Sequence, residues 1–104
     1  MRALTLAALL AAAPAAAGPQ PAPGRYCSVG QDLPDISIGP GSGVGIDLMD
    51  CPVAVIADGR VRSRRCYGMG GAEVPYDADL AVRPDGSLLH DGAVYRRIDR
   101  GLCR

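Results

Sequence analysis

The stretch over residues 35–51 constrains the fold of this chain more than any other part of the sequence. Apolar residues alternate with small or polar ones over 36–38 and again over 44–48, on the two sides of a loop of glycine, proline and serine. A period of two residues is typical of a half-buried strand, and such a loop between two strands is typical of a hairpin. The stretch therefore predicts a β-hairpin that ends in Cys51, and it contains no catalytic motif.

Short apolar runs separated by turn residues continue along the rest of the chain. Asp-Gly turn signals recur at 58–59, 85–86 and 91–92. Further strands are expected at 26–29, 52–57, 60–66, 79–83, 87–90 and 93–98. The pattern predicts an all-β fold, a small antiparallel barrel or sandwich of about seven short strands, stabilised by disulfides.

The hairpin that turns at Asp58-Gly59 can be drawn in two registers. A two-residue turn places Cys51 opposite Cys66, but it also places Val55 opposite an arginine. A three-residue loop pairs Val55 with Val61 instead and gathers the apolar side chains on one face. We therefore expect the three-residue loop, which removes the support for a local bridge between these two cysteines.

Residues 1–17 have the layout of a secretory signal peptide. Arg2 provides a positive start, residues 4–13 an apolar core, and a run of alanines ending at Ala17 a small-residue cleavage site. We expect cleavage near Ala17 and a mature protein in the periplasm or outside the cell. The apolar run is shorter than the ~20 residues of a membrane span, and Cys27 does not directly follow a small-residue box. Neither a membrane span nor a lipid anchor is therefore expected.

Two further parts follow the predicted signal peptide. Residues 18–24 carry a proline at every second position from Pro19 to Pro23, which disfavours both a helix and a central strand. We expect a disordered, proline-rich leader over 18–24 and a single β domain over 25–104.

The predicted β domain contains all four cysteines of the chain, Cys27, Cys51, Cys66 and Cys103. An even number in an exported protein favours two disulfides. Each would contribute on the order of 2 to 4 kcal/mol to a domain with a small core. Three pairings are open, and the spacing does not choose among them. A metal site is not expected, because no two cysteines have C-x-x-C spacing and the chain has a single histidine.

Charge and composition exclude several classes of function. The formal net charge is zero, and the chain has no lysine. A protein that binds nucleic acid needs an excess of cations to neutralise phosphates, so no nucleic-acid partner is expected. Schiff-base chemistry on a lysine is excluded as well, and no cofactor is predicted.

No catalytic residue is assigned. His90 precedes an Asp-Gly turn and is expected at a solvated hairpin corner. Asp77 and Asp79 share one face of an extended segment, but neither has a partner for acid–base chemistry that the sequence identifies. An enzyme is therefore not predicted, and the alternative of a small hydrolase would depend on His90 together with an aspartate.

Arg60, Arg62 and Arg64 alternate along one expected strand and so project from one face. Guanidinium groups in a row can bind the carboxylates of an acidic protein or the phosphates of an anionic polymer. The alternative is a solvated strand face that discourages pairing with other sheets. Tyr67 and Tyr76 flank a glycine-rich stretch nearby and are the tyrosines expected closest to the surface.

Gly41, Ser42 and Gly43 form the tip of the loop in the first hairpin and complete the candidate partner-binding residues. No Gly-Lys-Ser/Thr follows them, so a phosphate-binding P-loop is not expected. The Ser/Gly tip resembles the loop that periplasmic inhibitors of c-type lysozyme insert into the enzyme's cleft. The basic and tyrosine positions expected after that loop are held here by Gly45 and Ile46. The resemblance implies a small disulfide-containing antiparallel barrel that inhibits lysozyme.

A second resemblance rests on Tyr26-Cys27 and Asp50-Cys51. It is to small exported bacterial β proteins that carry an early Tyr-Cys and a later strand ending in cysteine, and it implies no activity. The sequence as a whole predicts an exported, non-enzymatic binding module of unknown ligand. Its expected partner is an envelope or extracellular protein or an anionic polymer. A lysozyme-type inhibitor and a structural envelope component are the alternatives.

Overall fold

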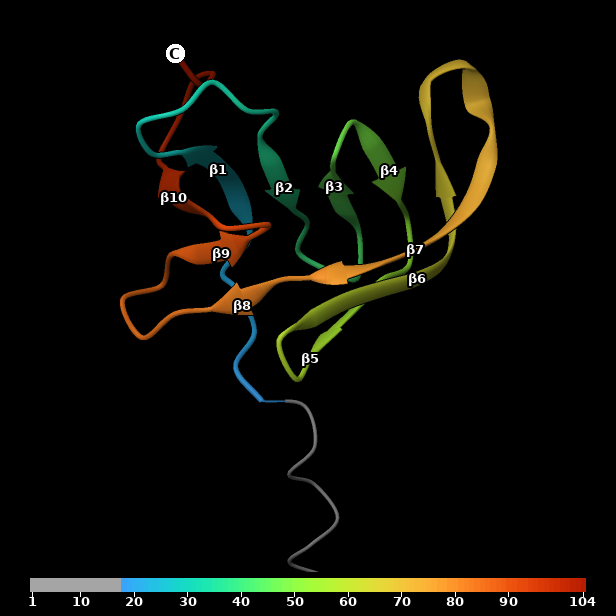
Figure 1. Ribbon diagram of the computed structural model, residues 1–104, viewed down its shortest axis with the longest axis horizontal. Helices are drawn as coiled ribbons and strands as arrows, with labels where there is room; N and C mark the ends of the chain where they lie inside the picture. Colours follow the sequence, from blue (N-terminus) through green and yellow to red (C-terminus); the bar gives the residue numbers. More distant parts are fainter. Residues whose placement is uncertain (1–17) are drawn as a thin grey trace, which may run out of the picture.

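The computed structural model describes residues 18–104, which form an antiparallel β structure (Figure 1). The predicted signal peptide, residues 1–17, lies outside the described residues. The strands are β1 (Gly24–Ser28), β2 (Ile36–Ile38), β3 (Val44–Ile46), β4 (Met49–Cys51), β5 (Val55–Ala57), β6 (Arg60–Tyr67), β7 (Glu73–Asp79), β8 (Ala81–Val82), β9 (Leu88–His90) and β10 (Ala93–Ile98). A 3-10 turn, η2 (Met69–Gly71), lies between β6 and β7. Over residues 18–104, no helix has the length and apolar character needed to cross a membrane.

All these strands belong to one curled sheet that forms a half-barrel. Its order is β5-β6-β4-β3-β2-β1-β10-β9-β8, and β7 pairs with β6. Every pairing is antiparallel. The predicted all-β antiparallel class is confirmed. The predicted count of about seven strands is wrong, because the sheet has ten, and its half-barrel differs from the closed barrel or sandwich that we expected.

Some of the additional strands arise where a tight bend splits an expected strand. The strand expected over 44–48 ends at Ile46, because Asp47 and Leu48 form a turn with φ of 51° and 63°. Aspartate tolerates left-handed backbone, but leucine adopts it rarely, so an Asp-Leu pair is only a weak signal of a turn. The chain returns at once, and Met49 of β4 pairs with Ile46 of β3.

β7 and β8 are separated only by the buried Leu80 and together bridge the two ends of the sheet. β7 pairs with β6 near one end of the strand order, and β8 pairs with β9 at the other. In Figure 1, β6 and β7 form a long ribbon whose tip projects on the side of the molecule away from β1 and β10. One extended segment therefore links the two ends of the half-barrel.

The core is built from aliphatic side chains, tyrosines and one disulfide, because the sequence has no phenylalanine or tryptophan. Burial alternates along the strands, as in β2, where both isoleucines are buried and the serine between them is exposed. The largest fully buried side chains are Tyr26, Ile36, Ile46, Leu80, Leu88, Val61, Cys51 and Cys66. They come from strands along the whole sheet, so the core forms only when the sheet curls as a unit.

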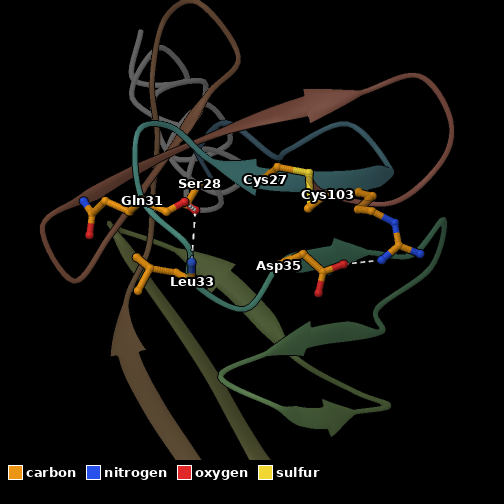
Figure 2. The surroundings of a disulfide bond; sticks show 7 residues. Cys27, Ser28, Gln31, Leu33, Asp35 and Cys103 are labelled. Carbon is orange, nitrogen blue, oxygen red and sulfur yellow. Dashed lines mark hydrogen bonds and ion pairs between the residues drawn. A yellow bond between two sulfur atoms is a disulfide. The ribbon is translucent and has the colours of Figure 1, made fainter.

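The two predicted disulfides are present, and the structure defines their pairing. Cys27 bonds to Cys103 across a sequence separation of 76, and Cys51 bonds to Cys66 across a separation of 15. Figure 2 shows the first bond joining β1 to the C-terminal tail. Beside it, the hydroxyl of Ser28 accepts a hydrogen bond from the backbone N–H of Leu33 at 3.3 Å, which fixes the loop after β1. The second bond lies in the core.

The β5–β6 hairpin corrects the register that we expected. Val55 pairs with Arg62 and Ile56 with Val61, so the turn has two residues, Asp58-Gly59, rather than three. An Asp-Gly turn with positive φ at both positions matches the twist of the strands that it joins. The core takes Ile56 and leaves Val55 outside, which the expected register reversed. The cysteine bridge that this expectation disfavoured is therefore formed.

The proline-rich leader also differs from its predicted disorder. Pro21 is buried, and the side-chain amide of Gln20 donates a hydrogen bond to the carbonyl of Ile56 at 2.7 Å. The hydroxyl of Tyr26 donates to the carbonyl of Ala22 at 2.6 Å. Proline prevents helix formation and ladder pairing, but it leaves carbonyls that side chains can bind. The segment therefore packs against β5 without joining the sheet.

Candidate functional site

A hollow of about 1010 Å³ lies over the exposed side of β5, β6 and the middle of β7. We call it the outer groove. The side chains that define it are Val53, Val55, Arg62, Arg64, Tyr67 and Tyr76. Apolar surface and guanidinium groups thus meet in one depression.

The outer groove follows from the alternation of β6. Val61 and Ser63 face the core, so Arg62 and Arg64 between and beyond them face outward. The two-residue turn then places Val55 opposite Arg62.

Two valines give the groove its apolar surface. Val53 is 69% exposed and Val55 is 62% exposed. Single exposed apolar residues are common, but a contiguous apolar patch beside charged residues is typical of an interaction site.

The arginines of this face are neutralised unequally. Asp77 accepts from Nε of Arg60 at 2.8 Å and lies 3.5 Å from Nε of Arg62. The hydrogen bond from Arg60 and the positive charge of both arginines lower the pKa of the Asp77 carboxyl. Arg65 pairs with Glu73 at 3.0 Å.

Arg64 differs from its neighbours. Within residues 18–104 it takes part in no ion pair, and its side chain is exposed. An exposed guanidinium with no carboxylate partner is available to an incoming anion in the bidentate geometry that arginine favours.

The structure separates the two predicted groups of partner-binding residues. Arg62 and Arg64 line the outer groove. Arg60 lies beside the groove and forms an ion pair with Asp77, which lines it. The tip of the first hairpin loop, Gly41 to Gly43, borders a smaller hollow of about 310 Å³ next to the leader.

The glycine-serine tip is nevertheless tied to the segment that carries Val53. The backbone N–H of Ala54 donates to the carbonyl of Ser42 at 2.8 Å. The hydroxyl of Ser42 donates to the carbonyl of Pro52 at 3.3 Å. The loop thus supports the edge of the groove from behind without lining it.

Val53 and Val55 are the groove residues that sequence reasoning missed, because the expected register turned them toward the core. A signal for their position was present. Asp58-Gly59 is the residue pair that a two-residue turn prefers, and accepting it would have placed Val55 with the arginines. Tyr67 and Tyr76, expected near the surface, both line the groove and are half-buried.

His90 is buried, which corrects its expected place at a solvated corner. Its side chain is 4% exposed. Nδ1 lies 2.7 Å from the carbonyl of Asp79, and Nε2 lies 3.2 Å from the carboxylate of Asp47. Asp47 also accepts a short hydrogen bond from the hydroxyl of Tyr76. Both ring nitrogens are therefore engaged within the protein.

Burial and polar contacts act on His90 in opposite directions. Burial alone would lower the pKa of the imidazole. The hydrogen bond to Asp79, together with the hydrogen bond and negative charge of Asp47, outweighs burial, and the pKa of His90 is raised. The same carboxylate and burial raise the pKa of the Tyr76 hydroxyl.

Among the residues that the structure describes, no three histidine, cysteine, aspartate or glutamate side chains gather into a cluster that could hold a metal ion. Comparisons of the chain with protein-family models, with curated proteins and with solved structures gave no match.

Proposed function

We propose that this protein is an exported, non-catalytic binding module that takes an anionic, partly apolar ligand in the outer groove. The observation that carries the proposal is the position of Arg64, a guanidinium without an ion pair in the described chain, beside the exposed valines 53 and 55. Two disulfides in a chain of this size support an oxidising compartment, the periplasm or the cell exterior.

The groove supplies two complementary terms to binding. Arg64 offers charge-assisted hydrogen bonds, and Arg62 is held toward the groove by its contact with Asp77. Burying Val53 and Val55 under a ligand would remove their apolar surface from water. An anion alone would use only the first term, so the groove favours a ligand that carries an apolar group next to its negative charge.

An acidic segment of a protein partner satisfies both terms. Valine or leucine two positions from glutamate or aspartate presents apolar and anionic groups on the same face of an extended chain. A polymer of sugar phosphates would leave the two valines in water. The partner that we propose is therefore an extracellular or envelope protein with an exposed acidic and apolar segment.

The polar groups near the groove support binding rather than catalysis. The hydroxyl of Ser63, on the inner face of β6 behind the groove, donates to the carbonyl of Val53 at 2.7 Å and so is not held as a nucleophile. The two nitrogens of His90 are occupied by Asp79 and Asp47. A general base needs a free nitrogen within reach of the proton that it takes.

Binding can be tested with an acetylated, serine-spaced peptide in which valine and glutamate stand two positions apart and so share one face, titrated into the oxidised protein by calorimetry. We expect Arg64→Ser to weaken binding by roughly 10- to 100-fold, because a charge-assisted hydrogen bond is worth on the order of 1.5 to 3 kcal/mol. Arg83→Ser, an exposed arginine outside the groove, is the matched control and should leave Kd unchanged. Equal affinity for the peptide with glutamine in place of glutamate would refute the proposal.

A further inference from the structure

A polar cluster that joins the buried His90 to the partly exposed Asp47 and Tyr76 stands behind the outer groove and shares one residue with it. Tyr76 lines the groove with its side chain, and its hydroxyl donates to the carboxylate of Asp47. The same carboxylate faces Nε2 of His90 at 3.2 Å. The cluster thus connects the imidazole of β9 to the groove through the β3–β4 turn and β7.

Among the described residues, the charged groups that surround His90 are all acidic. Asp47 approaches from the β3–β4 turn. Asp79 approaches from the end of β7, with its carbonyl at 2.7 Å and its carboxylate at 4.0 Å from Nδ1. The ring of Tyr95 in β10 lies 6.2 Å away, and the backbone N–H of Asp91 is bound to the Asp79 carboxylate. None of these groups is a cation, so the site favours an imidazolium.

The hydrogen bonds also require that form. The carbonyl of Asp79 can only accept, so Nδ1 carries a proton. The carboxylate of Asp47 can only accept when ionised, so Nε2 must carry one too. Loss of the Nε2 proton sets a nitrogen lone pair against a carboxylate, and the contact that holds Asp47 in place becomes repulsive.

The position of Asp47 depends on such a contact, because the backbone of this turn does not have a conformation that its residues usually prefer. Asp47 and Leu48 both have positive φ, 51° and 63°, without being glycine. Leu48 is 66% exposed and gives the turn no anchor in the core. His90 and Tyr76 are therefore the side chains that hold the carboxylate end of this turn.

We propose that protonation of His90 sets the affinity of the outer groove for its anionic ligand, acting through Asp47 and Tyr76. The proposal deepens the binding function proposed above and rests on it. The protonated form binds more tightly for two reasons. It holds Asp47 and hence the Tyr76 side chain in the groove, and its positive charge compensates a carboxylate that would otherwise repel the ligand.

The connection is tested first without any ligand. His90 is the only histidine of the chain, so its imidazole signals in an NMR titration of the full protein are unambiguous. We expect the methyl signals of Val53 and Val55 to shift with the same midpoint as His90, while the methyls of Leu102, in the C-terminal tail beyond β10, do not. Asp47→Asn should lower that midpoint, because it removes the carboxylate that holds the proton.

Affinity is tested next with the valine-glutamate peptide, whose carboxylates stay ionised from about pH 6 to about pH 9. We expect Kd to rise roughly two- to fivefold across this range, as for one screened unit charge near the groove. In His90→Gln and in Asp47→Asn the rise should be smaller. If the methyl signals of Val53 and Val55 do not shift with the His90 titration, the proposed connection is overturned even if the peptide binds. If those signals do shift with the His90 titration but the protein binds no peptide, the proposed binding function is overturned instead.

Discussion

The two faces of β6 share one backbone and differ in almost everything else. The inner face presents Val61 and Cys66, both with no exposed surface, to the core. The outer face presents Arg62 and Arg64 to water. The inner residues are fixed by packing and by a disulfide, whereas nothing in the fold requires the outer ones to be arginine. The comparison indicates that the inner face specifies the sheet and that the outer face is available for a partner.

The largest effect should come from removing the disulfide of the inner face. We expect Cys51→Ala with Cys66→Ala to lower the free energy of unfolding by about 3 to 4 kcal/mol, because the loop between them is released in the unfolded chain. Urea unfolding of the two oxidised proteins measures the difference.

The outer face offers a control for this change on the same strand. Arg62→Ala with Arg64→Ala also replaces two residues, but it should change the free energy of unfolding by less than about 1 kcal/mol. If replacing the two arginines lowers the free energy of unfolding as much as removing the disulfide does, the two faces do not have separate roles in stability and in binding.

The next effect comes from His90, a buried polar residue. We expect His90→Ala to cost about 1 to 3 kcal/mol near pH 6, because it removes a buried side chain together with its hydrogen bonds to Asp79 and Asp47. The pKa of His90 is raised in the folded state by Asp79 and Asp47, against the effect of burial. Its contribution is therefore complete below the unfolded pKa, about 6.5, and is lost as pH rises through the folded value.

Urea unfolding at several pH values tests that sign. The difference between His90→Ala and the parent protein should shrink as the solution becomes more basic. Leu89→Ala, an exposed neighbour without a titratable group, should give a difference that does not vary with pH. A His90 effect that grows with pH would show that the imidazole is neutral in the folded protein.

The smallest effect on stability should come from Arg64→Ser. The side chain is exposed and has no ion pair within residues 18–104, so the free energy of unfolding should change by less than about 0.5 kcal/mol. The same variant should lose most of its affinity for the acidic peptide. A drop in stability above about 1 kcal/mol would assign Arg64 to the fold and not to the outer face.

Local patterns predicted the parts of the fold that local residues decide. The alternation of Ile36 and Ile38, and of Val44 and Ile46, gave the correct strands and the correct buried side. It failed at Leu48, where the turn uses positive φ without glycine. Such a turn is held by Tyr76 and His90, which are distant in sequence, so no local signal records it.

In the candidate site, too, local patterns predicted some residues, and others depend on contacts between distant parts of the sequence. The outward direction of Arg62 and Arg64 follows from the period of a strand, and the structure places both in the groove. Whether the valines face the groove or the core depends on the strand register, because a shift of one residue turns every side chain to the other face. The register that gathers the apolar residues on one face was the wrong one. The contact of the buried His90 with Asp47 joins residues that are 43 positions apart, so no local pattern predicts it.

The hydrogen bond from Gln20 to Ile56 has a consequence for assembly. β5 ends the strand order, and the end of a sheet is where another chain can add a strand and a fibre can grow. A molecule that approaches this edge meets a carbonyl already occupied and, beside it, prolines that have no N–H to offer. The leader thus blocks part of this edge against the addition of another strand.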